Sequence, residues 1–431
     1  TQTLQSECLF AVIKLIKKTK MKKVLLSIFT ITIIGFFSSC NSDDDGVLIP
    51  VDPIPIETDT ILQGQITSDK TLTNDLIWEI EGRVTVTAGV TLTIEAGTII
   101  KAYAGSGANA STLIIARDAK VMANGTSNNP IIFTSTADNI QLGQTVGGNL
   151  TENDRGLWGG IIVLGNANIS VEGNATETQI EGIPASDTNG LYGGNNNSDN
   201  SGEINFISIR HGGAEIGEGN EINGLTLGAV GSGTTISNVE VVANVDDGIE
   251  FFGGSVNMSN ALVWAQGDDG LDIDQAYSGT ISNSVVILGD ISDHAMEIDG
   301  PEGALEGSFN LNGITLIGNQ NTENGEYADY RSNAMGTSNN VYAIGFKDSS
   351  DVELDNDGVA TNYNNGKLQF GIWQIVLPLG VTNVQDLFVN KAENVTVSGF
   401  GGDAQAVSEG GTVGANLSDF EWTYTNAKGA L

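Results

Sequence analysis

The stretch that decides the fold runs from Asp246 to Asp299 and reads DDGIEFFGGSVNMSNALVWAQGDDGLDIDQAYSGTISNSVVILGDISDHAMEID. Three of its segments are alike at offsets of 22 and 25 residues, and each follows a β-rich run: Asp246–Glu250, Asp268–Asp272 and Asp293–Glu297. Such a repeat, built from short β segments and Gly, Asn or Asp turns, is typical of a solenoid whose coils stack. The sequence therefore predicts outward columns of equivalent positions, and here those columns are acidic.

Alternation along each short strand separates core residues from outward ones. If Ile249 and Phe251 point inward, Glu250 points outward, because successive side chains of a strand lie on opposite faces. The same pattern places Leu271, Ile273, Met296 and Ile298 in the core. We therefore expect an outward column of Glu250, Asp272 and Glu297 flanked by Asp274 and Asp299, and a turn column of Asp246, Asp268 and Asp293 beside Asp247, Asp269 and His294.

Stacked carboxylates repel one another when they are ionised, and the coils of a parallel sheet lie only about 4.8 Å apart. The repulsion is about 3 kcal/mol at an effective dielectric near 20, and under ~1 kcal/mol in bulk water. A groove beside the column would therefore favour a bound cation or a carboxyl group with a raised pKa. Full exposure would leave a merely solvated face.

Composition supports one long ordered β domain. The 431 residues include 56 Gly but only 7 Pro, with 16% charged and 6% aromatic residues, which is unlike a disordered chain. Solenoids grow by adding coils, so length does not require several domains. We expect short β runs throughout a solenoid from residue 63 to 400, the first of them at residues 78–87, 90–101, 111–122, 130–135 and 159–164.

Two features interrupt or mark the coils. Residues 174–202 contain a run rich in Asn, Ser and Gly that predicts an inserted loop. Asn238, Asn260 and Asn283 recur at offsets of 22 and 23 residues, each after an Ile-Ser or Met-Ser pair, and Leu311-Asn312-Gly313 continues the series. Because Asn tolerates left-handed backbone geometry, we expect these residues to form a stacked column at a turn.

The N-terminal region resembles a lipoprotein export signal. We expect residues 1–20 to be an extension upstream of the true start, Met21, and residues 21–39 to be a signal peptide, since the 14 apolar residues after Lys23 are too few for a comfortable membrane anchor. The end of this stretch resembles a lipobox, which makes Cys40 the lipidated residue. The acidic residues 41–46 resemble the surface-export signal of Bacteroidota lipoproteins, or else form a solvated tether, and the spacer extends to residue 62.

Charge limits the partners. Residues 1–39 contain six Lys and one Glu, so the mature chain carries 12 basic and 52 acidic residues, a formal charge of −40. Nucleic acid is excluded as a partner because a phosphate backbone requires basic neutralisation, whereas divalent cations and neutral or cationic ligands fit. Cys8 and Cys40 are the only cysteines, so the mature domain has no disulfide. We expect a monomer held to outer-membrane lipid through Cys40.

Several segments carry a family resemblance: residues 92–101, 128–135, 158–161, 220–228 and 420–424. Through them the chain resembles the right-handed parallel β-helix of pectate lyases, polygalacturonases and surface adhesins, and more narrowly a group of Bacteroidota surface β-helix proteins without a firm biochemical function. The resemblance implies the handedness, the fold and the cellular location. We also expect residues 401–431 to cap the solenoid, with Phe420, Trp422 and Tyr424 covering the last coil.

The acidic repeat allows three interpretations. Asp-Asp-Gly is ordinary turn chemistry, in which Asp caps the bend and Gly supplies a positive φ. It is also a source of oxygen ligands for a hard cation such as Ca²⁺, here from Asp246, Asp247, Asp268, Asp269 and Asp293. The third interpretation is catalysis by Asp268 and Asp269 with His294.

The catalytic interpretation lacks several expected partners. Gly267-Asp268-Asp269 resembles the Gly-Asp-Asp segment of polygalacturonases, but no Gly-His-Gly and no Arg-Ile-Lys follows. For the basic residue that a pectate lyase requires, Arg210 and Arg331 are the candidates, and neither lies in the acidic repeat. Arg210-His211-Gly212-Gly213 forms either a second polar site or a satisfied strand edge.

Aromatic residues raise the alternative of a glycan-binding surface. Trp264 and Tyr277 could stack on a sugar beside the acceptors Glu250, Asp272 and Asp274, unless they pack in the core. Our preferred interpretation is a surface lipoprotein that binds an extracellular polymer, most reasonably a glycan, with Ca²⁺ on the acidic coils. The alternatives are a polysaccharide lyase or glycoside hydrolase, and a purely structural spacer.

Overall fold

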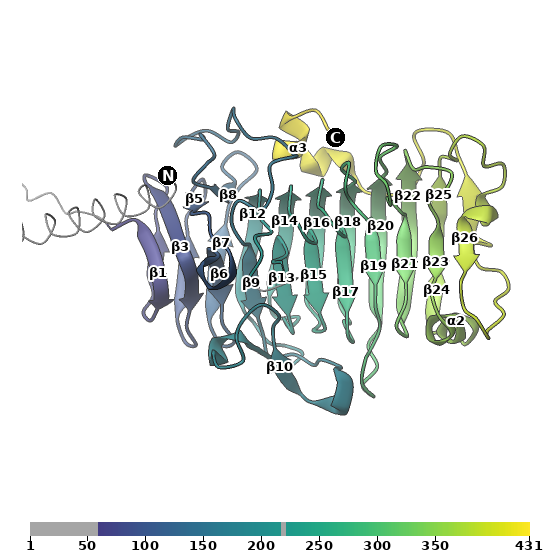
Figure 1. Ribbon diagram of the computed structural model, residues 1–431, viewed down its shortest axis with the longest axis horizontal. Coiled ribbons are helices and arrows are strands. Elements are labelled where there is room, and N and C mark those ends of the chain that lie inside the picture. The colour runs from purple at the N-terminus through teal and green to yellow at the C-terminus, as the bar shows by residue number, and fades with distance from the viewer. Residues whose placement is uncertain (1–58, 217–220) are drawn as a thin grey trace, which may run out of the picture. The chain divides into compact units, whose positions relative to one another are not determined.

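The chain forms a parallel β-helix, as Figure 1 shows for the computed structural model, which describes residues 59–216 and 221–431. One continuous sheet joins 25 strands, and consecutive coils pair in parallel. The predicted all-β solenoid is therefore confirmed. The expected signal peptide, Cys40 and most of the tether lie outside the described residues. Among the helices that the structure describes, none is long and apolar enough to cross a membrane.

The strands stack in three ladders. Four short strands lie wholly in the first ladder: β2 (Lys70–Leu72), β4 (Thr91–Ile94), β7 (Lys120–Asn124) and β24 (Leu368–Phe370). Six long strands contribute their first halves to it: β12 (Gly202–Arg210), β14 (Thr235–Val242), β16 (Asn257–Trp264), β18 (Thr280–Ile287), β20 (Phe309–Ile317) and β22 (Gly336–Ile344). The second halves of these long strands form another ladder with the first half of β3 (Ile77–Val86), β5 (Ile99–Ala102), β8 (Ile131–Ser135), β25 (Trp373–Ile375) and β27 (Ala404–Ala406).

The third ladder presents the acidic residues and is called here the acidic face. It consists of the second halves of β1 (Ile61–Ile66) and β3, followed by β6 (Thr112–Ile115), β9 (Ile161–Leu164), β13 (Leu225–Gly228), β15 (Ile249–Phe252), β17 (Leu271–Asp274), β19 (Met296–Ile298), β21 (Ala328–Tyr330), β23 (Val352–Leu354) and β26 (Phe388–Asn390). The first half of β1 pairs with the first half of β3 in the second ladder.

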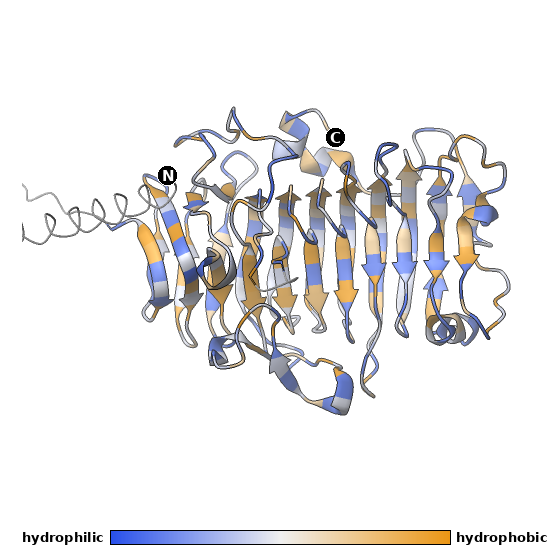
Figure 2. Cartoon of the chain, viewed as in Figure 1, coloured by the Kyte–Doolittle hydropathy of each residue, from blue (hydrophilic) through white to orange (hydrophobic). Residues whose placement is uncertain are grey.

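The core follows the predicted alternation. Ile249, Phe251, Leu271, Ile273, Met296 and Ile298 are all buried inside the helix. Apolar and polar bands accordingly alternate along the strands in Figure 2. Each such aliphatic or aromatic side chain contributes about 1.5–3 kcal/mol by its burial, so the inward positions supply the stability of a domain without disulfides.

The long strands bend at the predicted asparagine column. Asn238, Asn260 and Asn283 have φ of 53°, 56° and 49°, and their amides bond from coil to coil at 2.9 and 2.6 Å. The prediction of stacked left-handed turns is confirmed. The series continues at Gly313 and Asn340, with φ of 74° and 56°, one residue beyond the expected Asn312.

The predicted insertion is an ordered substructure. Within it, β10 (Glu177–Gln179) and β11 (Leu191–Gly193) pair antiparallel, and Figure 1 shows β10 projecting from the body of the solenoid. The ring of Tyr192 lies 6.0 Å from that of Phe252, and the Tyr192 hydroxyl accepts a hydrogen bond from Gln275 (2.8 Å). The insertion therefore packs beside β15 and β17 of the acidic face.

The C-terminal segment does not cover the last coil, contrary to expectation. The solenoid itself continues to β27, and the following turn η5 (Leu417–Phe420) and helix α3 (Tyr424–Ala427) lie over the middle strands (Figure 1). The backbone N–H groups of Tyr424 and Thr425 donate to the buried carboxylate of Glu240 (3.1 and 2.7 Å). The reason is that the outward positions there are apolar, notably Leu262 and Val285, and require cover.

Candidate functional site: a buried carboxylate column

Five carboxylates stand in register on the acidic face, and we call them the acidic column. The predicted members Glu250, Asp272 and Glu297 are direct neighbours on β15, β17 and β19. The register continues to Asp329 on β21 and Glu353 on β23. All five side chains are only 5–8% exposed although they point away from the core, so the mutual repulsion expected of a partly buried column applies.

Sequence analysis missed the last two members of the column. Their coils lack the Asp-Asp-Gly motif, and Asp329 follows Glu297 by 32 residues, well outside the spacing of the earlier coils. The signal that could have found them is local. Asp329 lies between Ala328 and Tyr330, and Glu353 between Val352 and Leu354, so each is a single acidic residue flanked by inward apolar ones.

A flanking column runs beside the acidic column, two residues further along each strand. Backbone hydrogen bonds connect its successive coils: Asp299 to the strand of Asp274, Arg331 to that of Asp299, Asp355 to that of Arg331 and Lys391 to that of Asp355. Asp274 and Asp299 occupy the predicted places. The later positions bring two basic residues into line with them, which the repeat did not indicate.

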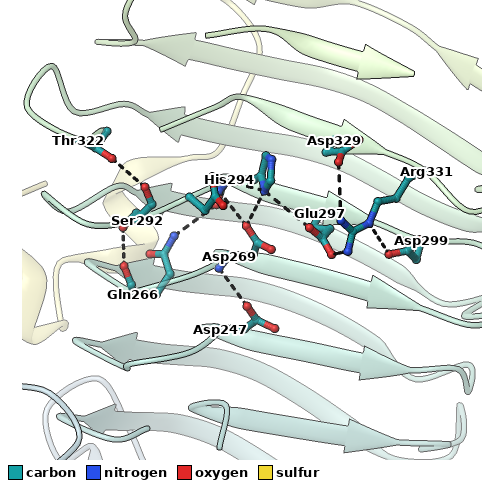
Figure 3. A network of polar contacts seen from close by, with 11 residues as sticks. Asp247, Gln266, Asp269, Ser292, His294, Glu297, Asp299, Thr322, Asp329 and Arg331 are labelled. Carbon is teal, nitrogen blue, oxygen red and sulfur yellow. Dashed lines mark hydrogen bonds and ion pairs between the residues drawn. The ribbon is translucent and has the colours of Figure 1, made fainter. Parts of the chain in front are cut away.

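The turn before each strand forms a third column. Asp247 accepts a hydrogen bond from the backbone N–H of Asp269 (2.9 Å), and Asp269 accepts one from the N–H of His294 (2.8 Å). Figure 3 shows these carboxylates pointing from one coil to the next. The turn interpretation is thus correct for one oxygen of each carboxylate, because each bonds the following coil.

Six carboxylates lie close together on the first two coils of the acidic column, those of β15 and β17: Asp246, Asp247, Glu250, Asp268, Asp272 and Asp274. Oxygens of Asp247, Glu250 and Asp272 lie within 4.8 Å of one another, and so do those of Asp246, Asp247 and Asp268. Asp247 therefore belongs to both groups. Asp274 is next to them in the flanking column. Within the part of the chain that the structure describes, no basic nitrogen lies within 4 Å of these six carboxylates.

Burial and repulsion raise the pKa throughout this cluster. For Asp247, Glu250 and Asp272, loss of solvent, followed by the charges of neighbouring carboxylates, holds the pKa well above its usual range. The same causes raise the pKa of Asp246 and Asp274 to about 7. These groups are therefore costly to ionise unless a cation compensates them.

Two buried oxygens beside the cluster have no hydrogen-bond partner among the residues that the structure describes. One is Oδ1 of Asp272 and the other is Oδ1 of Asn223, whose side chain is 1% exposed. The amide nitrogen of Asn223 donates to Glu250, which places the amide against the column. Ca²⁺ takes six to eight oxygen ligands from carboxylates, amide carbonyls and water. Asp247, Glu250 and Asp272 offer three converging carboxylate oxygens of this kind, and the amide oxygen of Asn223 is a fourth candidate, so protein side chains supply part of such a ligand set.

The expected metal ligands Asp269 and Asp293 are engaged differently. Nδ1 of His294 lies 2.8 Å from Asp269 and 4.0 Å from Asp293, and it is 3.7 Å from Glu297. Burial lowers the pKa of His294, but the hydrogen bond and charge of Asp269, with the charges of nearby carboxylates, outweigh it and raise the pKa to about 9. The imidazolium therefore serves as a cation at this coil. Asp268, the most exposed of the group, has its pKa raised to about 6.

Arg331 lies within the acidic columns, which corrects the expectation that it falls outside them. Its guanidinium donates to Glu297 and to Asp299 (2.8 Å) and lies 3.9 Å from Asp329, as Figure 3 shows. Lys391 likewise pairs with Glu353 and lies 3.8 Å from Asp351. The cause of the error is that strand pairing joins residues more than thirty positions apart.

Trp264 and Tyr277 form no sugar-stacking platform. Tyr277 is 2% exposed, its ring lies 4.8 Å from that of Phe251, and its hydroxyl donates to the carbonyl of Val256 (2.7 Å). Trp264 is on another ladder, beneath the C-terminal segment, 6.3 Å from the ring of Tyr424. Both residues belong to cores, because each completes the packing of a neighbouring aromatic ring.

Arg210 and His211 also have a structural role. The Arg210 guanidinium is buried 4.5 Å from the ring of Tyr424 and donates to Ser208 (2.7 Å) and to the carbonyl of Thr145 (2.9 Å). Nδ1 of His211 contacts the carbonyl of Asp154 (2.7 Å). The contact with Tyr424 holds Arg210 against the C-terminal segment, and the side chains of Arg210 and His211 are only 1% and 0% exposed, which favours the structural interpretation of this pair.

Comparison with known proteins gives one match. The family described as pectate-lyase like beta helix domain matches residues 64–425, almost the whole described part of the chain. No curated protein and no solved structure matches the chain significantly. The family match agrees with the parallel ladders and includes every residue of the acidic, flanking and turn columns.

Proposed function

The chain belongs to the pectate-lyase-like β-helix family, and from this we propose that it binds a polysaccharide along the acidic face. The face supports this proposal through its rows of outward acceptors, which repeat at about the coil spacing of 4.8 Å. An extended polymer can contact several coils at once, and carboxylate oxygens accept hydrogen bonds from sugar hydroxyls. The strong negative charge favours neutral or cationic chains over polyanions unless a cation intervenes.

We further propose that Ca²⁺ binds between Asp247, Glu250 and Asp272. One observation carries the proposal: six carboxylates on the first two coils have no basic partner in the described structure, and three of their oxygens already converge within 4.8 Å. The unpartnered amide oxygen of Asn223 supplies a further ligand of the right kind. A bound cation would neutralise the coils and offer an open coordination position to a sugar oxygen.

The test is binding to a polysaccharide panel with either millimolar Ca²⁺ or EGTA. We expect Ca²⁺-dependent binding that is lost in Asp247→Asn and Asp272→Asn. Glu203→Gln is the matched control, since it removes one carboxylate from the exposed first ladder and should bind as the unaltered protein does. Binding that is indifferent to EGTA and to both variants would contradict the proposed site. Binding to no polysaccharide would favour the structural spacer.

An enzyme is the second candidate, and the Asp269–His294 pair favours it. Asp269 orients the imidazole through Nδ1, and Nε2 makes no hydrogen bond to the residues that the structure describes. Such a carboxylate–imidazole pair can hold a proton for transfer to a substrate. Release of reducing ends or unsaturated products from a polysaccharide, abolished in Asp269→Asn and in His294→Gln, would replace the binding proposal by this one.

We also propose that the protein is an outer-membrane lipoprotein exposed at the cell surface. The support is the sequence signal that ends at Cys40, followed by the acidic residues 41–46. Metabolic labelling with a fatty acid should modify the protein, and Cys40→Ala should abolish the label. Protease treatment of intact cells should digest the β-helix, and resistance to it would contradict surface exposure.

A further inference from the structure

The later coils of the acidic face contain their own cations. Arg331 projects from the flanking column and contacts three carboxylates: Glu297 and Asp299 on the preceding coil, and Asp329 on its own coil. His294 occupies the turn column between Asp269 and Glu297. From the third coil onward, positive side chains therefore interleave with the acidic column, as the dashed contacts in Figure 3 show.

Lys391 repeats this arrangement at the end of the column. Its ammonium pairs with Glu353 and approaches Asp351, and oxygens of Glu326, Asp351 and Glu353 converge within 4.8 Å of one another. This is the same ligand spacing as in the Asp247–Glu250–Asp272 group. Asp329 is in register with Glu353 and 5% exposed. Within residues 59–216 and 221–431, its Oδ1 has no hydrogen-bond partner, and neither do Oε2 of Glu326 and Oδ1 of Asp351.

The two ends of the acidic column thus differ in whether their carboxylate triad has a basic partner. Each has a triad of convergent carboxylate oxygens, but only the later triad has a basic side chain within 4 Å in the described chain. A buried carboxylate group is stable only when a charge or hydrogen bonds compensate it. The later triad has that compensation built in, whereas the earlier one requires it from outside.

We infer that Lys391 and Arg331 are resident counter-ions that confine the binding of external cations to the first two coils of the acidic column, those of β15 and β17. The inference rests on the proposed cation site and adds its boundary: the later triad is a latent divalent-cation site that the Lys391 ammonium fills. A Lys side chain is a point charge on a flexible stem, so it neutralises the triad without supplying oxygen ligands or an open coordination position. The polymer-binding cation is thereby restricted to one end.

The experiment counts Ca²⁺ bound per chain by equilibrium dialysis of the full-length protein at pH 8. Lys391→Gln should bind one more Ca²⁺ than the unaltered protein, because it exposes three convergent carboxylates without a counter-ion. Lys391→Arg, which keeps the charge, should bind the original number. Lys367→Gln removes the lysine of an exposed ion pair with Glu306 and serves as the matched control; it should also bind the original number.

Each outcome is decisive for the inference. An extra Ca²⁺ in Lys391→Gln but not in Lys391→Arg supports the inference. If the unaltered protein binds no Ca²⁺, that result overturns only the proposed site between Asp247, Glu250 and Asp272. An unchanged number in a Lys391→Gln protein with unaltered circular dichroism overturns the inference and leaves that proposed site standing. If Lys391→Gln fails to fold, Arg331→Gln replaces it, and failure to gain Ca²⁺ there overturns the inference as well.

Discussion

The carboxylate of Asp247 accepts a hydrogen bond from the backbone N–H of Asp269 on the following coil (2.9 Å). The relationship explains why an acidic residue recurs at this turn, since each carboxylate satisfies a backbone donor of its neighbour. It also leaves one oxygen of Asp247 available to the two groups of carboxylates that share this residue. Structural and ligand-binding roles therefore coincide in one side chain.

Replacing Asp247 by Asn should abolish most stabilisation by Ca²⁺. Asn keeps an oxygen acceptor for the N–H of Asp269 but removes the charge that a cation requires. At a free Ca²⁺ concentration of 100 times Kd, the unaltered protein should gain about 2.7 kcal/mol, measured as a rise in Tm. In EGTA the variant should differ by less than ~1 kcal/mol, because Asn keeps the acceptor for the N–H of Asp269, and burial, which raises the pKa of Asp247, makes the lost charge a costly one. An equal Ca²⁺ shift in both proteins would contradict the site.

Binding of Ca²⁺ should release protons near neutral pH. The carboxyl groups of Asp247, Glu250 and Asp272, whose pKa burial raises well above the usual range, must ionise when the cation binds between them. Affinity should therefore increase from pH 6 to pH 8, by about tenfold per pH unit for each proton released. Calorimetry in two buffers with different ionisation enthalpies measures the protons directly. Identical heats in both buffers would count against the prediction.

Without a cation, the protein should lose stability as pH rises from 5 to 8. A carboxyl group whose pKa is higher in the folded state binds protons more readily when folded, so its contribution falls as pH rises from the unfolded value to the folded one. Asp246, Asp274 and Asp329, each with a folded pKa of about 7, act in this direction. His294, raised to about 9, loses its contribution between pH 6.5 and 9. Tm measured in EGTA across this range tests the sign.

Arg331→Gln should destabilise the protein in EGTA, by about 1–3 kcal/mol at pH 8. The substitution removes the guanidinium that Glu297, Asp299 and Asp329 share, and the His294 imidazole remains close to Glu297. At pH 5 the loss should be smaller, since Asp299 and Asp329, with pKa of about 6 and about 7, are then protonated. Urea denaturation at both pH values measures the difference, with Lys367→Gln as the exposed control, expected within ~0.5 kcal/mol. A loss that is equal at both pH values would exclude the electrostatic cause.

The asparagine column should contribute through both backbone and side chain. Asn260→Ala places Ala at φ of 56° and removes two amide hydrogen bonds, so it should cost about 2–4 kcal/mol. Asn260→Gly relieves the backbone strain and should cost roughly half as much. The control is Asn310→Ala, since Asn310 is exposed and lies two coils further along the solenoid than Asn260; it should change the free energy of unfolding by less than ~0.5 kcal/mol. Equal losses for Ala and Gly would show that the left-handed backbone is unimportant.

The C-terminal segment should detach when its buried acceptor is changed. Glu240 accepts hydrogen bonds from the backbone N–H groups of Tyr424 and Thr425, and Glu240→Gln replaces one acceptor oxygen by a donor. We expect a cost of about 2–4 kcal/mol and faster proteolysis near residue 416. Tyr424→Phe loses only the hydroxyl bond to the carbonyl of Leu150 and should cost about 1 kcal/mol. Unchanged proteolysis in Glu240→Gln would contradict the anchoring role.

The sequence by itself determined the β-helix, the inward and outward residues and the first three members of the acidic column. These features depend on local periodicity, because a strand alternates every residue and each coil repeats after a similar length. The asparagine column was readable for the same reason. Asp329 and Glu353 were not, since both coils lack the turn motif and Asp329 follows Glu297 only after a longer coil.

Only the tertiary structure decided which charges meet and which aromatic residues are covered. Arg331 and Lys391 reach the acidic columns because irregular coils return to the same face, and coil length cannot be read from a motif that those coils do not contain. Trp264 is covered by a segment about 160 residues further along the chain. Local pattern fixes where a side chain points, but its burial, counter-ions and pKa depend on long-range packing.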